Sequence, residues 1–172
     1  MKLLLELRDE DVREKPKSGM LKKREATRAV AMKDNKLALM HVSRNGYHKL
    51  PGGGIEHGES IEAALFREML EETGCKIKIV SEVGKIIEHR THISELQTSY
   101  CFIANINAIG KSNLDEGEIK AGYMLEWATI DQAIKTLEKE MQDGRREASV
   151  TAKEKLENYI GKFIIKRDLA FL

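Results

Sequence analysis

The chain has 172 residues and a formal net charge of +1, and hydrophobic residues make up 41% of it against 33% charged residues. This is an ordinary balance for a soluble domain. So small a net charge argues against a general electrostatic attraction of the whole protein to nucleic acid or to membrane surfaces. No apolar stretch reaches the length of a membrane span, and no signal-peptide cleavage pattern follows residues 1–7. We therefore expect a cytoplasmic protein that binds neither nucleic acid nor membrane.

Six strands are predicted from β-prone runs that are bounded by turn and loop residues. The expected strands cover residues 1–7, 26–32, 36–43, 76–88, 97–107 and 124–128. Asp34-Asn35 and Asn45-Gly46 are turn signals, although the first lacks the usual glycine. Residues 50–54, Leu-Pro-Gly-Gly-Gly, must form a loop, because proline and three glycines continue neither a helix nor a strand.

Three helices are predicted from apolar residues at helical spacing. They cover residues 59–73, 130–141 and 147–159. In the first, Ser60 is the expected N-cap and Gly74 the C-terminal glycine. Its expected buried stripe consists of Ile61, Ala64, Leu65, Met69 and Leu70. Residues 111–122 are polar and expected to be irregular.

Strands thus outnumber helices and the helices are interspersed among them, which favours an α/β fold with a mixed sheet covered on both faces. We expect an N-terminal strand and connecting segment over residues 1–23 and a main domain over residues 24–145. A C-terminal helix and apolar tail over residues 146–172 are expected to pack on that domain, because an exposed tail would invite aggregation. Cys75 and Cys101 are expected to be buried free thiols.

Charge is distributed unevenly along the chain. Residues 13–28 carry seven Lys or Arg against two Glu, whereas residues 53–75 carry six Glu and one Arg. The basic stretch is either a solvated face or a source of attraction for an anionic substrate.

Glu68, Glu71 and Glu72 are three and four residues apart, so a helix places their carboxylates on one face. Carboxylates stacked in this way repel one another, and a hard cation such as Mg²⁺ or Mn²⁺ relieves that repulsion. The cluster therefore predicts metal-assisted chemistry. Removal of Glu72 is expected to cut activity by orders of magnitude and, by relieving repulsion, to stabilise the metal-free protein.

The acidic run is part of a longer pattern. Gly53 is followed after five residues by Glu59, and seven residues later by Arg67-Glu68-Met69-Leu70-Glu71-Glu72-Thr73-Gly74. Together with the preceding Leu50-Pro51-Gly52, this resembles the signature of the Nudix hydrolase family (MutT-like), with Cys75 standing where a larger aliphatic residue is usual. The resemblance implies an α/β/α sandwich with a mixed central sheet.

The resemblance also implies roles for residues of this signature, which is called the box below and covers residues 53–75. Glu68, Glu71 and Glu72 are the expected metal ligands, together with the backbone carbonyl of Gly52. Glycine at that position lets the backbone approach an ion without a Cβ in the way.

Arg67 is expected to orient a catalytic glutamate through a salt bridge. Glu59 is either its partner, a further support for the metal site, or simply an acid favoured at a helix N-terminus by the dipole. The general base is either a glutamate of the box, Glu71, or one from the later loop, where Glu118 is preferred over Glu116.

The histidines show no metal-ligand spacing on a helix and are expected to be structural or exposed. They are His41, His48, His57, His89 and His92. Tyr47 and His48 precede the glycine loop and are candidates for contact with a substrate ring.

These features predict a pyrophosphohydrolase that uses Mg²⁺, or Mn²⁺, to cleave a nucleoside diphosphate linked to another moiety, by attack of water at phosphorus. The alternative is a non-hydrolytic Nudix-fold module that binds or senses a nucleotide, against which the retained glutamates argue. An isoprenoid diphosphate isomerase shares the fold, but its additional Cys and Glu signature is not visible. The residues that distinguish the substrate subgroups of the family are not found downstream of the box, so a nucleoside triphosphate is the expected substrate. The apolar tail serves either the core or a homodimer.

Overall fold

The computed structural model of the chain describes residues 1–143 and 151–172. The strands are β1 (Leu3–Leu7), β2 (Lys22–Lys33), β3 (Lys36–Val42), β4 (Tyr47–Lys49), β5 (Cys75–Arg90), β6 (Glu95–Ile109) and β7 (Tyr123–Ala128). The helices are α1 (Ile61–Thr73), α2 (Glu116–Ala121), α3 (Ile130–Asp143) and α4 (Ala152–Phe171), with short 3-10 turns at Asp9–Val12 and Thr91–Ile93.

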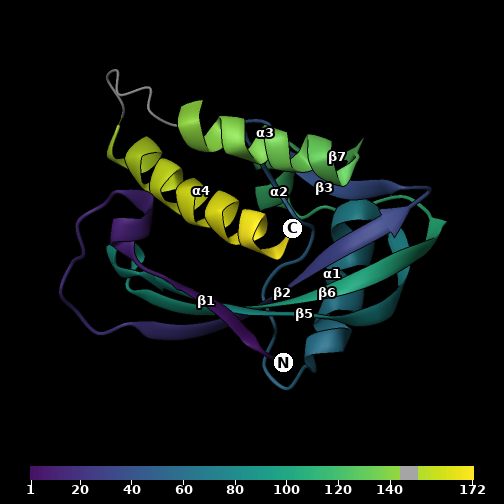
Figure 1. Cartoon of the computed structure of the whole chain (residues 1–172), viewed down its shortest axis with the longest axis horizontal. Helices are drawn as coiled ribbons and strands as arrows, with labels where there is room; N and C mark the ends of the chain where they lie inside the picture. The colour runs from purple at the N-terminus through teal and green to yellow at the C-terminus, as the bar shows by residue number, and fades with distance from the viewer. Residues whose placement is uncertain (144–150) are drawn as a thin grey trace.

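The strands form one mixed sheet in the order β1-β5-β6-β2-β3-β4, and β7 pairs with β3. β2 runs parallel to β6 and β1 parallel to β5, whereas the other pairs are antiparallel. Helix α1 lies on one side of the sheet and helices α3 and α4 lie on the other (Figure 1). The expected α/β/α arrangement with a mixed sheet is confirmed.

The core has two parts because strand side chains alternate between the faces of the sheet. In β2, Ala29 and Ala31 join the cluster under α1, while Val30 joins the cluster under α3 and α4. Small residues on the α1 side let that helix lie close to the sheet. This closeness brings the glutamates of α1 up against the glycine loop.

Local signals set the ends of α1. The Ser60 hydroxyl accepts a hydrogen bond from the amide of Ala63 at 3.1 Å, and Gly74 ends the helix with φ of +70°. A Cβ at residue 74 would lie 2.5 Å from the carbonyl oxygen of Gly110, so glycine is required there. The predicted caps are thus correct, and the helix begins two residues after the expected start.

The predicted buried stripe of α1 needs one correction. Ala64, Leu65 and Met69 are fully buried, but Leu70 is 46% exposed. In its place the helix buries the carboxylates of Glu68 and Glu72, which turn towards the glycine loop. The acidic face is therefore largely an interior face, which composition and periodicity do not reveal.

Three further elements differ from expectation. Strand β4 and helix α2 were not predicted, and α2 occupies part of the segment that was expected to be irregular. The expected helix over residues 147–159 lies partly outside the described residues, and its described part continues as α4 through the apolar tail. Within α4, Phe163 and Phe171 are buried in the core cluster against the sheet. Cys75 and Cys101 are buried free thiols, as expected.

Helix α4 is joined to the glycine loop by a buried polar contact. Asp168 accepts a hydrogen bond from the amide of Leu50 at 2.8 Å and another from Nε of Arg167 at 2.7 Å. Both charged side chains have no exposed surface. Among the described residues, no helix is long and apolar enough to cross a membrane.

Candidate active site

The glycine loop is packed directly against α1. A Cβ added at Gly53 would lie within 2.4 Å of the carboxylate of Glu68, and one at Gly52 would lie 2.2 Å from the carbonyl oxygen of Thr27. Gly52 also has φ of +127°, which L side chains rarely adopt. Glycine at both positions is thus a requirement for bringing the loop carbonyls beside the carboxylates.

Arg67 is the centre of an ion-pair network beside this loop. Its guanidinium donates two hydrogen bonds to Glu59, at 3.0 and 2.9 Å. The same group donates to Glu68 at 2.8 Å, to Glu71 at 3.1 Å and to the carbonyl of Gly54 at 2.9 Å. The hydrogen bonds from Arg67 lower the pKa of Glu59. Arg67 therefore fixes the carboxylate of Glu68, and Glu59 fixes Arg67.

Glu72 is held by a cation from another element. The ammonium of Lys49, at the end of β4, lies 2.5 Å from Oε1 of Glu72 and 3.1 Å from the carbonyl oxygen of Gly52. Oε2 of Glu72 accepts the amide of Gly52 at 2.8 Å. Lys49 is 5% exposed and also lies over the ring of Tyr123, 4.9 Å from its centroid. A positive charge thus already bridges two groups that the sequence assigned to metal binding.

Glu118 joins these carboxylates from α2. Oxygen atoms of Glu68, Glu72 and Glu118 lie within 4.8 Å of one another. Asp115 caps α2 by accepting the amide of Glu118 at 2.8 Å, while Glu118 accepts the amide of Asp115 at 2.8 Å. This reciprocal capping box holds the Glu118 side chain over the cluster.

Burial, and to a smaller extent like charge, raises the pKa of two carboxylates of this cluster. Burial raises the pKa of Glu68, and the neighbouring Glu72 adds to this while Arg67 opposes it. Burial also raises the pKa of Glu118, and Glu72 again adds to the effect. Three oxygen-donor side chains beside a glycine carbonyl are the ligand set that Mg²⁺ and Mn²⁺ prefer. The residues present therefore fit a hard divalent ion.

Glu71 occupies a different position from the other box glutamates. Its side chain is 41% exposed, and its contact at 3.1 Å is with Arg67. It lines a cleft of about 500 Å³ together with Glu68, Asn113 and Glu118. The structure thus places Glu71 at the rim of the carboxylate cluster, with Glu118 taking the third place inside.

A second cleft, of about 460 Å³, is also lined by Glu68 and Glu118, together with Glu72, and has a basic wall. Its lining includes Arg24, Arg28, Arg90, Tyr47 and Tyr123. Arg28 is 5% exposed and donates to the carbonyls of Thr27 at 2.6 Å and Gly53 at 3.2 Å, but its Nε has no partner among the described residues. Burial and the nearby Arg167 lower the pKa of Arg28 to about 10. A buried guanidinium with free hydrogen-bonding capacity is suited to an anion.

The two predicted substrate contacts are separated by the structure. Tyr47 lines the basic cleft, as a substrate contact would. His48 instead lies between Glu140 and Glu126, with Nδ1 2.5 Å from Glu140 and Nε2 3.2 Å from Glu126. Burial alone would lower the pKa of His48, but these two carboxylates outweigh it and raise the pKa. Alternation along β4 accounts for the separation, since neighbouring residues face opposite ways.

Sequence reasoning missed Lys49 and Arg28 as members of the site. Both belong to segments that the sequence marked for other reasons, Lys49 before the glycine loop and Arg28 in the basic stretch. A lysine immediately before a Leu-Pro-Gly-Gly loop, in a chain with buried glutamates, was an available signal for Lys49. Arg28 could be assigned to the site only from the parallel pairing of β2 with β6, which determines how deeply its side chain is buried.

Lys49→Met is expected to tighten the binding of Mn²⁺ to the protein by about tenfold, or 1.4 kcal/mol. The physical reason is that the ammonium of Lys49 competes with the ion for Glu72 and Gly52. Isothermal titration of the protein with Mn²⁺, in the absence of substrate, measures this. Lys36→Met, at an exposed position, is the control. Weaker Mn²⁺ binding in Lys49→Met would show that Lys49 supports the ion instead of competing with it.

The sequence profile of the NUDIX domain matches residues 22–149 of the chain. This match covers most of the chain, and the chain therefore belongs to the NUDIX domain family. The family resemblance of residues 50–75 is confirmed by it.

Curated relatives are similar over part of their lengths. An ADP-ribose pyrophosphatase of Methanocaldococcus jannaschii is 36% identical over 104 residues, which are 56% of this chain and 54% of that protein. An uncharacterised Nudix hydrolase of Bacillus subtilis is 31% identical over 98 residues, which are 55% of this chain and 62% of that protein. The chain thus matches little more than half the length of these relatives.

Solved structures share the fold. A NUDIX hydrolase from Nitrosomonas europaea superposes with a TM-score of 0.58 and 22% identity, covering 82% of this chain and 91% of the other. A MutT NUDIX hydrolase from Burkholderia pseudomallei gives a TM-score of 0.53 and 17% identity, covering 80% and 96%. At these identities the likeness supports the architecture alone.

Proposed function

We propose that the chain is a pyrophosphohydrolase that cleaves the anhydride bond of a nucleoside diphosphate linked to a second moiety. The observation that carries the proposal is the cluster of Glu68, Glu72 and Glu118, whose members line both an acidic cleft and a cleft with a basic wall. An acidic cluster alone would repel a diphosphate, so the arrangement is productive only with a divalent cation. Membership of the NUDIX domain family supports the same assignment.

Glu68, Glu72 and the carbonyl of Gly52 are the groups proposed to hold Mg²⁺ or Mn²⁺. When bound, the ion neutralises phosphate oxygens and lowers the pKa of a coordinated water. Arg67 contributes by keeping the Glu68 carboxylate in one orientation, and Glu59 keeps Arg67 in place through two hydrogen bonds. Because Lys49 contacts the same two groups, Glu72 and the carbonyl of Gly52, its ammonium would be displaced by an ion held there and could then donate to a phosphate oxygen of the substrate.

Glu118 is the proposed general base. Its raised pKa favours acceptance of a proton from water, and the capping box keeps one carboxylate oxygen tied to the amide of Asp115. One oxygen of this carboxylate lies within 4.8 Å of oxygens of Glu68 and Glu72. Glu71 is the alternative base, but its carboxylate is engaged by Arg67 at the rim. Comparing Glu118→Gln with Glu71→Gln separates the two, because the variant of the true base loses more kcat.

The basic cleft is proposed to receive the anionic part of the substrate beyond the cleaved bond. Arg28→Met is expected to raise KM by about 10- to 100-fold, which corresponds to the 1.5–3 kcal/mol of a hydrogen bond to a charged group. Steady-state kinetics measures this, with the exposed Arg44→Met as the control. An unchanged KM in Arg28→Met would place substrate binding elsewhere.

The substrate is best identified with a panel of nucleotides assayed with Mg²⁺ and Mn²⁺, read by phosphate release with and without added pyrophosphatase. Because the M. jannaschii relative is named an ADP-ribose pyrophosphatase, ADP-ribose belongs in the panel beside nucleoside triphosphates. Hydrolysis of at least one member is expected. Binding of nucleotides without any hydrolysis would favour the non-hydrolytic alternative.

A further inference from the structure

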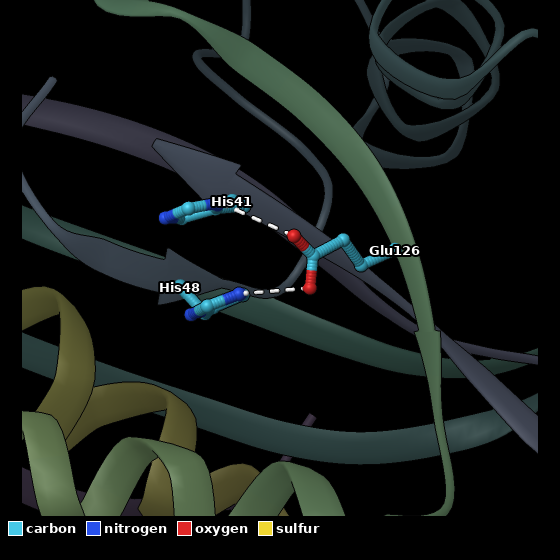
Figure 2. Close-up of side chains that lie close together, drawn as sticks. All are labelled: His41, His48 and Glu126. Atoms are coloured by element: carbon cyan, nitrogen blue, oxygen red, sulfur yellow. Dashed lines mark hydrogen bonds and ion pairs between the residues drawn. The ribbon is translucent and has the colours of Figure 1, made fainter. Parts of the chain in front are cut away.

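A second group of metal-ligating side chains lies outside the carboxylate cluster. It consists of His41 on β3, His48 on β4 and Glu126 on β7. One ligand atom from each residue lies within 4.8 Å of the others. Figure 2 shows the two imidazole rings one above the other, with the two carboxylate oxygens of Glu126 turned towards them.

Strand pairing builds this group. His41 and His48 are direct partners in the antiparallel β3–β4 ladder, and directly opposed residues have Cβ atoms about 4.5–5.5 Å apart. Glu126 comes from β7, which pairs with the other edge of β3. Three neighbouring strands thus each contribute one side chain, so the arrangement is fixed by backbone hydrogen bonds.

The distances suit a single ion. Nδ1 of His41 lies 3.2 Å from Oε1 of Glu126, and Nε2 of His48 lies 3.2 Å from Oε2 of Glu126. Ligand atoms placed about 2.0–2.1 Å from a tetrahedral ion lie roughly 3.3 Å apart. Each histidine nitrogen therefore lies about one such ligand–ligand separation from the Glu126 carboxylate, one at each of its two oxygens.

The ligand atoms are also available. His48 directs Nδ1 to Glu140 at 2.5 Å, and Glu140 further accepts the amide of His48 at 2.8 Å, which leaves Nε2 facing Glu126. A carboxylate that binds the distal nitrogen of a histidine is the usual outer partner of a metal-binding imidazole. Nδ1 of His41 is buried and makes no hydrogen bond within the described residues.

One rearrangement accompanies binding. The two rings stack 8° from parallel with centroids 4.3 Å apart, so their nitrogen lone pairs lie in parallel planes. Rotation of the His41 ring brings its lone pair towards that of His48. The stacking contact and the ion pair with Glu126 oppose this rotation, but Nδ1 of His41 has no hydrogen bond to break among the described residues. Glu126 is 49% exposed, which gives an ion and a water ligand access.

We propose that His41, His48 and Glu126 form a second metal site, which binds a borderline divalent ion of the Zn²⁺ type. Two imidazoles and one carboxylate favour Zn²⁺ over Mg²⁺, which prefers oxygen ligands alone. The site is distinct from the Glu68 cluster and does not depend on the proposed hydrolysis. A bound ion joins β3, β4 and β7, and through Glu140 it also reaches α3.

The test uses the full chain carrying Glu68→Gln and Glu118→Gln, which weakens the first cluster while leaving the Lys49–Glu72 pair intact. After chelation and dialysis, titration with Zn²⁺ is expected to give one equivalent bound. Adding His41→Asn is expected to weaken that binding by about 100-fold or more, and Glu140→Gln by about 10- to 100-fold. His57→Asn, at an exposed histidine, is the matched control and should change nothing.

Substitution with Co²⁺ provides a readout of geometry. Tetrahedral Co²⁺ is expected to give intense visible absorption that disappears in Glu126→Gln as well as in His41→Asn. Thermal unfolding of both variants verifies that they are folded. Failure to bind Zn²⁺, or equal binding by the parent, His41→Asn and Glu126→Gln, overturns the proposal.

Discussion

Glu72→Gln is expected to lower kcat of the proposed hydrolysis by about a thousandfold, or about 4 kcal/mol at 1.36 kcal/mol per tenfold. Glu72 is the box glutamate that contacts both the glycine loop and Lys49. Its replacement removes a ligand charge and leaves the loop amide with only a neutral acceptor. Kinetics on the substrate found in the panel, at saturating Mg²⁺, measures the loss. Activity within tenfold of the parent would remove Glu72 from the proposed ligand set.

The structure reverses the stability effect that the sequence suggested for this variant. Repulsion among three glutamates predicted a gain, but Glu72 neutralises a buried ammonium at 2.5 Å. Breaking a buried pair costs about 3–5 kcal/mol, because one charge is left uncompensated. Glu72→Gln is therefore expected to unfold at lower denaturant concentration than the parent. Glu68→Gln is the comparison, since Arg67 keeps Glu59 and Glu71 as partners and the repulsion with Glu72 is relieved.

Sequence alone could predict the parts of the site that are fixed by local hydrogen bonding. The spacing from Gly53 to Gly74 determines one loop and one helix, and the cap at Ser60 sets the helix start. Helix α2 was open to prediction as well, since Asp115-Glu116-Gly117-Glu118 has the form of a capping box. That pattern would have placed Glu118 on a helix instead of in an irregular segment.

Side-chain clusters that depend on how the strands pair could not be predicted from the sequence. His41 and His48 are equidistant from the turn at residues 43–46, so the Asn45-Gly46 signal could suggest their pairing. Glu126 could not be added, because nothing local specifies that β7 pairs with β3. Lys49 and Arg28 likewise reach the cluster only through the sheet order. Whether a charged side chain is buried depends on its tertiary neighbours, and the hydrophobic periodicity of a sequence does not contain that information.

Helix α4 shows the same limit on the scale of a whole element. Its last two turns combine apolar residues with Arg167 and Asp168, both fully buried, so charged residues do not mark a solvent face in this part of the helix. An apolar tail was the natural interpretation of such a segment. Ile160 and Ile164 of this helix line the basic cleft, although the family match ends at residue 149. The C-terminal helix is thus part of the proposed binding site.

Asp168→Asn is expected to lower the free energy of unfolding by about 3–5 kcal/mol, the usual cost of breaking a buried ion pair. Asparagine still offers an oxygen to the amide of Leu50, but it no longer neutralises Arg167, whose Nη1 lies 3.8 Å from Glu88. Urea unfolding measures the change. Glu157→Gln, a one-third exposed acid on the same helix, is expected to cost no more than about 0.5 kcal/mol.

The double variant Arg167→Met with Asp168→Asn separates charge from shape. If the loss in Asp168→Asn arises because Arg167 keeps only the more distant Glu88, which Arg90 also neutralises, removing the guanidinium restores more than half of the loss, since buried pairs can be replaced by apolar groups at little cost. A double variant as unstable as the single one would instead assign the loss to the Leu50 contact. In that case Asp168 acts mainly by positioning the loop that contains Gly52. The single variant Asp168→Asn would then also weaken Mn²⁺ binding, by more than the fraction of unfolded protein accounts for.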